Sequence, residues 1–537
     1  MPRLSRRSAV SRLALASLLA PLGPELVLAA TTPRRGGTLT AIVQPEPVVL
    51  TAAVNTAAPT QFVSGNVFDG LVDYAFDLSL RPSLATSWEV APDGKTITFH
   101  LRQGVLWHDG QPFTSADVKW SLENVWQTIH PRNKSIYKNV ETVDVPDEHT
   151  VVLRLKAPSL AIMSTLNASG ATILPRHLYE GTDILTNPYN NKPIGTGPFV
   201  FKEWKKGEYI LLERNPHYWD QDKPYLDKLI FKVVPDAAAR AAALEKGEAQ
   251  YAILSPVPLR EAERLGKLPQ LRIETRGYEW LSPVFYLDFN IDNPYLKDVK
   301  VRQALAHAID LQAIAKIVWY GFAVPAISPV PSTVPFFHNP DVPRYAFDPA
   351  RAETLLDEAG LKRGANGVRF KLTHDFLPYG DDFKRTGDYL KQALKRVGIE
   401  VDIRAQDTAS FIKRVYADRD FDVSSSWNGA FPDPQMGITR IYWSGWVGSG
   451  TPWTNASGYK NPLVDDLIDQ AAISPDAKAR AELFRKFQTV VQTDLPTLPL
   501  AELRFFTLHA ANLRDLTQQG DQVYASVKNA WFDTSAE

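Results

Sequence analysis

Two adjacent carboxylate pairs are the side chains in this 537-residue sequence best suited to acid–base chemistry. Asp381-Asp382 and Asp465-Asp466 could share a proton if both acids faced one site. Successive side chains on a helix point in different directions, however, so we expect these acids on solvated helix faces. The motifs GxSxG, HExxH, GxxxxGKS/T and GxGxxG are absent, and the ten histidines show no i, i+4 pairing. The sequence therefore names no nucleophile, base, cofactor site or metal site, and we expect a protein that is not an enzyme.

The composition is that of a soluble globular protein with more than one domain. Apolar residues make up 44% of the chain and charged residues 22%. A length of 537 residues exceeds one ordinary hydrophobic core and predicts two or three domains. The charges nearly cancel, with 59 Lys and Arg against 60 Asp and Glu, so neither nucleic acid nor a lipid surface is an expected partner. The absence of cysteine excludes disulfides, thiolate nucleophiles and a lipid-carrying cysteine.

Residues 1–30 have the pattern of a secretory signal peptide. Arginines precede a short apolar run from Leu13 to Ala20, and the small residues Ala29-Ala30 end the segment. That run is too short to cross a bilayer of about 30 Å. The adjacent Arg6-Arg7 leaves twin-arginine export as an open alternative. We expect a freely soluble protein in the periplasm of a two-membrane bacterium, and not a lipoprotein.

The periodicity of the chain predicts a β-rich first half and an α/β second half. Residues 84–102 form a hairpin pattern around Asp93-Gly94, and alternating apolar residues predict a strand at 151–155. Strands are also expected at 399–403 and 421–423. Helices are expected at 298–318, 349–360, 382–397, 461–473 and 474–493, the last two each opened by a cap and a proline. Alternating helices and strands predict a parallel sheet in the second half.

Four segments carry a resemblance to a known family. They are Phe68–Val72 with Pro82–Val118, Ile194–Phe199 with Arg214–Trp219, Val301–Asp310, and Gly458–Asp465. In this order they resemble solute-binding protein family 5, the peptide/nickel/opine-binding class of receptors for ABC-type importers. Most of these residues are glycines, prolines and tryptophans suited to turns and cores, so we expect them to hold the fold rather than the ligand.

The resemblance implies an α/β, two-lobed periplasmic binding protein of type II, in the large class with an extra β-rich domain and a ligand cleft between the lobes. Lobe 1 would comprise residues 31–68, 195–283 and 505–537, with the inserted domain at 69–194. Lobe 2 would comprise residues 284–504. Hinges would lie near Pro283 to Asn290 and Glu502 to Thr507. The implied partners are a small-molecule solute and an inner-membrane ABC permease with its ATPase subunits, and the receptor would be a monomer.

The resemblance implies two positions at which relatives carry a charged ligand-binding residue. This sequence has an uncharged residue at both positions. In peptide-binding relatives, an Asp in a cleft segment pairs with the ligand amine, and that position here is Ala430. The dipeptide-type relatives use an Arg before a Pro-Tyr pair for the ligand carboxylate, and Leu377 precedes Pro378-Tyr379 here. A buried, unpaired ammonium costs on the order of 2–5 kcal/mol. A free dipeptide is therefore a disfavoured ligand.

Aromatic and polar residues surround the expected amine position. We expect the ligand to contact Trp427, Asn428, Arg440 and Trp443, with Asp433, Tyr442, Gln44, Glu46 and Trp280 as further candidates. Flat rings with a few directional polar groups suit a peptide-like chain, an opine or an oligosaccharide. The planar fork of Arg440 would bind a carboxylate or a phosphate. Alternatively, about half of the aromatic residues between 427 and 459 fill the core of lobe 2.

Other functions stay open at this point. A secreted hydrolase would need a reactive group that the sequence does not assemble. A periplasmic sensory protein or chaperone could use the same fold. Metal or haem capture is disfavoured by the missing cysteine and the scattered histidines.

Overall fold

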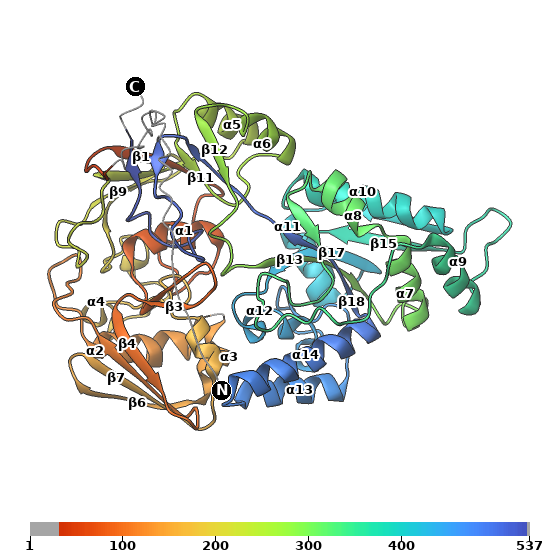
Figure 1. Ribbon diagram of the computed structural model, residues 1–537, viewed down its shortest axis with the longest axis horizontal. Helices are drawn as coiled ribbons and strands as arrows, with labels where there is room; N and C mark the ends of the chain where they lie inside the picture. The colour runs from red at the N-terminus through yellow and green to blue at the C-terminus, as the bar shows by residue number, and fades with distance from the viewer. Residues whose placement is uncertain (1–31, 131, 534–537) are drawn as a thin grey trace, which may run out of the picture.

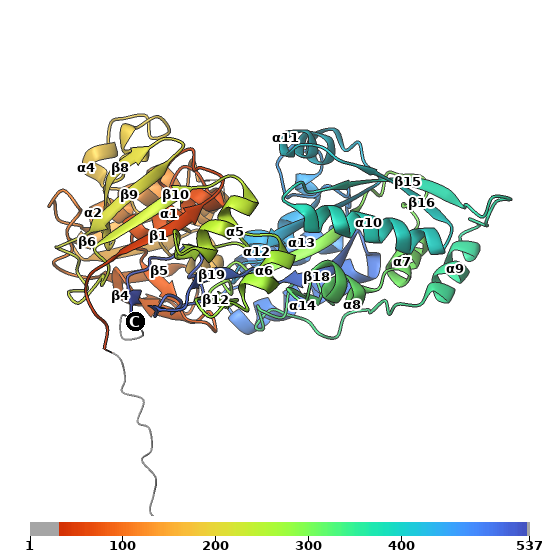
Figure 2. The ribbon, with the colours of Figure 1, turned by 90° about the horizontal axis from the view of Figure 1, so that it is seen from above.

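Two lobes lie side by side, joined by two crossings of the chain (Figures 1 and 2). The structure is a computed structural model that describes residues 32–130 and 132–533. The expected signal peptide, residues 1–30, lies outside these described residues. No helix within the described ranges is long and apolar enough to cross a membrane. The fold is the mixed α/β, two-lobed arrangement expected from the sequence.

A seven-stranded sheet forms the centre of lobe 1. Its order is β12 (Leu271–Glu274), β19 (Thr507–Ala510), β11 (Tyr251–Ala252), β1 (Thr38–Val43), β10 (Lys228–Val233), β9 (Tyr209–Arg214) and β8 (Phe199–Lys205). Strand β1 runs parallel to both neighbours. Helices α1 (Ala58–Val67), α5 (Ala237–Glu245) and α6 (Leu259–Leu265) belong to the same lobe (Figure 1). The sheet thus gathers three distant parts of the chain.

A four-stranded antiparallel sheet belongs to the segment between α1 and β8. Its order is β4 (Ala85–Val90), β5 (Thr96–Leu101), β7 (Thr150–Leu155) and β6 (Val140–Asp147). The predicted hairpin is confirmed, with Gly94 in its turn at φ +66°. The predicted strand is confirmed as β7, where Val151, Leu153 and Leu155 are buried. Helix α2 (Ser115–Ser121) has a capping box between Thr114 and Asp117.

Lobe 2 contains a six-stranded mixed sheet. Its order is β14 (Ala323–Pro325), β18 (Thr497–Leu503), β13 (Pro283–Phe289), β17 (Val423–Gly429), β15 (Phe370–Phe376) and β16 (Ile399–Arg404). Strand β15 is parallel to β16 and β17, as the helix–strand alternation predicts. Strand β13 is antiparallel to both of its neighbours. We propose that the chain divides between the lobes as the resemblance implies.

Three of the five helices predicted in lobe 2 are confirmed with nearly the expected bounds. Helix α9 (Pro349–Glu358) is capped by Asp348, α10 (Asp381–Arg396) is followed by Gly398 at φ +83°, and α13 (Pro462–Ile473) is capped by Asn461. Two boundaries differ. Helix α14 (Ala477–Asp494) is capped by Asp476, so Ser474 and Pro475 precede it. The strand expected at 421–423 is β17, which begins at Val423.

The helix predicted over 298–318 is interrupted. Helix α7 (Val299–Ala308) ends before Ile309, and the short helix α8 (Leu311–Ala313) runs into a π-helical turn at Ile314–Val318. The side chain of Asp310 accepts hydrogen bonds from the backbone N–H groups of Gln312 and Ala313 at 2.9 and 3.1 Å. An aspartate whose side chain caps a new helix competes with the backbone hydrogen bonds that would continue the preceding helix. The spacing of apolar residues carries no information about this competition, so it predicted one continuous helix.

The first two segments that carry the family resemblance meet around Asp69 in lobe 1. Its carboxylate accepts hydrogen bonds from Trp219 Nε1 at 2.8 Å, the Tyr218 hydroxyl at 3.0 Å and the Thr196 hydroxyl at 3.3 Å. A Cβ atom on Gly195 would lie 1.9 Å from the Val67 carbonyl oxygen, so only glycine fits there. As expected, these residues hold the fold together.

The two chain crossings lie at residues 275–282 and 504–506. The sequence places one hinge at Pro283 to Asn290, but Pro283–Phe289 is strand β13, hydrogen-bonded on both edges inside lobe 2. The first chain crossing therefore precedes this strand, and a hinge at either crossing stays a prediction. The second expected hinge agrees with the crossing between β18 and β19. The Tyr278 hydroxyl ties the two crossings together through Thr507 Oγ1 at 2.9 Å.

Candidate functional site

Most of the predicted ligand-binding residues lie at the end of β17 and in the loop that follows it. This loop contains α12 (Pro434–Gly437) and a 3₁₀ turn at Thr439–Ile441. Asn428 Nδ2 donates to the Gly437 carbonyl oxygen at 2.7 Å. A Cβ atom on Gly437 would lie 1.9 Å from the Gly429 carbonyl oxygen. The loop is therefore folded back on itself, and Asn428 serves to close it.

Trp427 lies where lobe 2 meets a chain crossing. Its half-buried ring packs edge-on against Phe505, with the ring centroids 5.0 Å apart. Phe505 is part of the second crossing, and it also packs against Tyr278 of the first, at 6.2 Å. Trp427 can therefore offer a ring face beside a chain crossing, which suits a ligand held between lobes. Trp443, also half-buried, packs edge-on against Trp446 at 6.3 Å.

Arg440 is a half-buried cation with no carboxylate in ion-pair contact among the described residues. Its Nη2 atom donates to the Pro452 carbonyl oxygen at 2.7 Å. Its Nε atom is buried and has no hydrogen-bond partner among the described residues. Burial lowers the pKa of Arg440, and electrostatic interactions with Tyr286 and Tyr416 oppose this effect. The guanidinium is thus incompletely satisfied by the protein.

Arg132 is a second cation at this site, and sequence reasoning missed it. Its guanidinium carbon lies 4.6 Å from the centroid of the Phe431 ring, in the loop that carries Arg440. Burial lowers the pKa of Arg132 to about 10, and the charge of Arg440 contributes to the lowering. Arg132 belongs to the segment inserted between α1 and β8, about three hundred residues away in sequence. No local motif marks it, so no sequence signal was available.

Three predicted residues of this region have their polar atoms engaged within the fold. Asp433 forms an ion pair with Arg480, and both side chains are buried. The Tyr442 hydroxyl contacts Thr497 Oγ1 at 2.6 Å. Trp280 is fully buried and donates from Nε1 to the Ser164 carbonyl oxygen at 3.2 Å. Their role as ligand contacts stays a prediction, and each has a structural role that accounts for its position.

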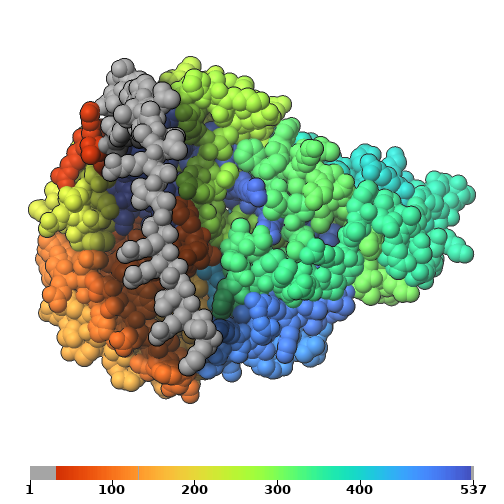
Figure 3. Space-filling view, in the orientation of Figure 1, coloured from red at the N-terminus to blue at the C-terminus, as the bar shows by residue number. Residues whose placement is uncertain are grey.

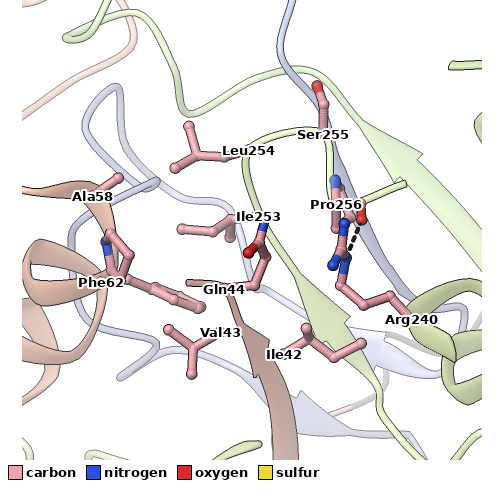
Figure 4. Close-up of a pocket in the computed structure, with 11 residues that line it drawn as sticks. Ile42, Val43, Gln44, Ala58, Phe62, Arg240, Ile253, Leu254, Ser255 and Pro256 are labelled. Carbon is pink, nitrogen blue, oxygen red and sulfur yellow. Dashed lines mark hydrogen bonds between the residues drawn. The ribbon is translucent and has the colours of Figure 1, made fainter. Parts of the chain in front are cut away.

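Gln44 and Glu46 lie apart from the Arg440 loop, beyond the carboxyl end of β1. Gln44 lines a pocket of about 60 Å³, where Arg240 donates from Nε to the Pro256 carbonyl oxygen (Figure 4). Glu46 Oε1 accepts from Trp204 Nε1 and from the Gly207 amide, both at 2.9 Å. Glu46 thereby fastens the turn between β8 and β9. Gln44 is exposed and stays a candidate of lobe 1.

The two positions of the expected peptide clamp are buried and apolar. Ala430 is 1% exposed, and its amide donates to the Ser282 carbonyl oxygen at 3.0 Å. Leu377 is fully buried, and its amide donates to the Ser425 carbonyl oxygen at 2.9 Å. Neither side chain can pair with a charge on a ligand.

The lobes touch each other at a distance from the crossings. Helix α13 contacts the 3₁₀ turn at Leu160–Ser164, and a Cβ atom on Gly94 would lie 3.2 Å from Pro475. The surface is hollowed between the lobes, and blue residues of the C-terminal part are visible within the hollow (Figure 3). Over the described ranges, no group of three or more His, Cys, Asp or Glu residues could hold a metal ion. The candidate site contains aromatic rings and cations, and its role as a ligand site stays a prediction.

Comparison with known proteins identifies the family. The family model described as bacterial extracellular solute-binding proteins, family 5 Middle, matches residues 79–449. The dipeptide-binding protein of Escherichia coli (strain K12) is 30% identical over 478 residues, which cover 83% of this chain and 87% of that protein.

Solved structures agree with this match over nearly the whole chain. The ABC transporter-associated periplasmic binding protein DppA from Helicobacter pylori, in complex with peptide STSA, gives a TM-score of 0.77 at 27% identity, covering 93% of this chain and 99% of that one. The PBP AgaA from A.tumefacien R10, in complex with agropinic acid, gives 0.72 at 26% identity, covering 93% and 99%. This chain belongs to family 5 of the bacterial extracellular solute-binding proteins.

Proposed function

We propose that this protein is a periplasmic receptor that captures a polar solute between its lobes and delivers it to an ABC import permease with its ATPase subunits. The observation that carries the proposal is Arg440, a half-buried guanidinium in the loop after β17, whose Nε atom is buried and has no partner among the described residues. Buried donors without partners are rare in folded proteins and mark places where a ligand or water completes the bonding. Trp427 and Trp443 would add ring faces to the same site.

Several finer features belong to this proposal. The receptor would bind its solute without chemical turnover, because the sequence assembles no catalytic group. It would act as a monomer, exported by a signal peptide at residues 1–30 and not anchored by a lipid, since the chain has no cysteine. A ligand that contacts both lobes binds the closed form better and shifts the equilibrium towards it.

The ligand class follows from the charges at the site. Ala430 and Leu377 cannot form the clamp that relatives use for a dipeptide zwitterion, which disfavours a free dipeptide. A blocked peptide-like chain, an opine or an oligosaccharide is consistent with the rings and with Arg440. One relative is described in complex with agropinic acid, which is compatible with a ligand other than a peptide.

Uptake measurements test the proposed role. A strain without this gene should lose import of the solute that co-purifies with the protein, and complementation with the wild-type gene should restore it. Complementation with Arg440→Ala should restore the protein level but not the uptake. Unchanged uptake in the deletion strain would contradict the importer role.

A further inference from the structure

A small cavity in lobe 1 brings three acidic residues and one lysine together. Asp69 and Asp73 line it from the segment that follows α1, and Asp521 and Lys528 line it from the C-terminal segment. The cavity has a volume of about 10 Å³, which is close to the space of one water molecule. Residues that line so small a cavity are close neighbours, although they come from opposite ends of the chain.

Only part of the negative charge at this cavity is compensated. Lys528 Nζ forms an ion pair with Asp73 Oδ2 at 3.2 Å. The Asp69 carboxylate accepts hydrogen bonds from three uncharged donors, which satisfy its oxygens without cancelling its charge. If every acid were ionised, the cluster would therefore hold three negative charges against one positive charge inside the lobe.

Asp521 is the acid that the fold satisfies least. Its side chain accepts one hydrogen bond, from Asn167 Nδ2 to Oδ2 at 2.8 Å. Its Oδ1 atom is buried and has no hydrogen-bond partner among the described residues. The buried hydroxyl of Ser169, which lines the same cavity, also lacks a partner within the described ranges. A buried carboxylate with an unpaired oxygen is costly, whereas a carboxylic acid is neutral and can donate its proton, so the geometry favours the protonated form.

The electrostatic surroundings agree with this geometry. Burial raises the pKa of Asp521 to about 7, the charge of Asp73 adds to the rise, and the hydrogen bond from Asn167 opposes it. Burial by itself would lower the pKa of Lys528, but the charges of Asp73 and Asp69 raise this pKa above its ordinary value. Two carboxyl groups in one buried site do not both ionise readily, so one of them keeps a proton.

The segment that bears Asp521 is hydrogen-bonded to the first chain crossing. The Gly520 carbonyl oxygen accepts from the Trp280 amide at 2.9 Å, and the Val523 amide donates to the Gly277 carbonyl oxygen at 3.0 Å. Asp521 lies between these two anchors in the sequence. A change in the charge of Asp521 therefore acts on the backbone that holds the crossing in place.

Other titratable and charged side chains also surround this segment. Besides the cluster itself they are Tyr74, Tyr524, Glu279, Arg81, Arg132 and Asp220. Burial raises the pKa of Tyr74 well above its usual range and that of Tyr524 to about 12, so both stay uncharged at neutral pH. Glu279 accepts from the Gly277 amide at 2.7 Å, and burial raises its pKa. Glu279 is therefore the acid of the crossing from which Asp521 must be distinguished.

We propose that Asp521 holds a proton in mildly acidic solution, shared within the cavity with Asp73, and that loss of this proton loosens the C-terminal segment from the first chain crossing. The ionised carboxylate places a second negative charge beside Asp73 and leaves Oδ1 without a donor. Movement of the segment relieves both costs by admitting water. The inference concerns the mobility of the crossing, and it holds for any solute that the receptor binds.

The sign of the pH dependence follows from the binding of the proton. Asp521 binds a proton more tightly in the fold than in the opened segment, so its stabilising contribution is present in acid and declines as pH rises towards 7. Global unfolding would mix this effect with that of buried His374, whose lowered pKa acts in the opposite direction. A local measurement is therefore needed.

Hydrogen exchange of backbone amides, followed by mass spectrometry of the whole protein, provides that measurement. Peptides covering residues 275–282 and 519–528 are compared after correction for the intrinsic pH dependence of exchange. Their protection should fall by about tenfold per pH unit between pH 5 and pH 7 and change little above the pKa of about 7. Constant protection in the wild type across this range would overturn the inference.

Variants assign the response to the cavity. Asp521→Asn has the shape of the protonated acid and keeps an acceptor for Asn167, so its protection should stay high and independent of pH. Asp73→Asn removes the neighbouring charge, so the response should shrink and move to lower pH. Glu279→Gln, in the crossing, and Asp144→Asn, which removes an exposed acid paired with Arg154, should both respond like the wild type.

The outcomes with these variants decide the inference. A response that persists in Asp521→Asn, or one that disappears in Glu279→Gln, would show that another acid controls the crossing. If Asp521→Asn does not fold, Asp73→Asn decides instead, and an unshifted response in that variant would contradict the shared proton.

Discussion

Asp433 and Arg480 form a buried ion pair whose side chains are 3% and 2% exposed. Arg480 Nη2 donates to Asp433 Oδ1 at 2.9 Å, and Arg480 Nε donates to the Ala471 carbonyl oxygen at 2.7 Å. Asp433 also accepts from the Gln435 amide at 2.9 Å. The pair thus fastens the loop that bears Arg440 to α13 and α14.

Removing one partner of this pair should destabilise lobe 2. Arg480→Ala leaves the Asp433 carboxylate buried without its counter-charge, which typically costs 3–5 kcal/mol. Urea unfolding should show this loss in the free energy of unfolding. Arg440→Ala is the matched comparison, and it should change that free energy by less than about 1 kcal/mol while abolishing ligand-induced stabilisation. A large destabilisation by Arg440→Ala would make Arg440 a structural residue.

Asp69 should be equally important for lobe 1. Asp69→Ala removes the acceptor of three side-chain donors, from Trp219, Tyr218 and Thr196. At about 1 kcal/mol or more for each stranded donor, the variant should lose about 3 kcal/mol of stability. Asp69→Asn keeps an acceptor oxygen and should lose less. Thermal unfolding distinguishes them, and equal melting temperatures for Asp69→Ala and the wild type would contradict this role.

Acid should destabilise the protein through its buried histidines. Burial lowers the pKa of His374 to about 3, so this side chain stays neutral in the fold. The unfolded chain takes up a proton below about pH 6.5, so the stability is present above that pH and is lost as pH falls towards 3. The loss is about 1.4 kcal/mol per pH unit, or about 2 kcal/mol at pH 5.

The pH dependence can be assigned by substitution. His374→Gln should reduce the difference in unfolding free energy between pH 7 and pH 5 by about 2 kcal/mol. His217→Gln, at an exposed position, serves as the control and should leave that difference unchanged. If His374→Gln has the same pH dependence as the wild type, His374 is not the group that titrates.

Trp427 should contribute to solute binding rather than to folding. Its half-buried ring rests on Phe505, so Trp427→Ala removes a ring face at the crossing without opening a deep cavity. We expect solute affinity to fall at least tenfold, measured by the fraction of protein that retains co-purified solute. Trp88→Ala, which removes a half-buried ring of β4 in lobe 1, should retain solute like the wild type. Full retention by Trp427→Ala would remove this residue from the site.

Local sequence signals predicted many of the helices and strands. Contacts between residues far apart in the sequence could not be predicted in this way. Turns such as Asp93-Gly94 and caps such as Asp348 act within a few residues, so they can be read from the chain. The partner of Asp433 lies 47 positions away, and the sequence alone gave no reason to choose Arg480. Arg132 reaches Phe431 only because the lobes come together. The expected clamp positions, Ala430 and Leu377, could be named from the sequence only because a family resemblance supplied the alignment.

The most direct test is a native mass spectrum of the protein purified from its own periplasm, recorded before and after mild denaturation. We expect one small molecule per chain, released on denaturation and absent from Arg440→Ala prepared in the same way. A released free dipeptide would contradict the interpretation of Ala430 and Leu377. Wild-type protein that carries no solute, together with turnover of a peptide or glycan substrate, would contradict the receptor function itself.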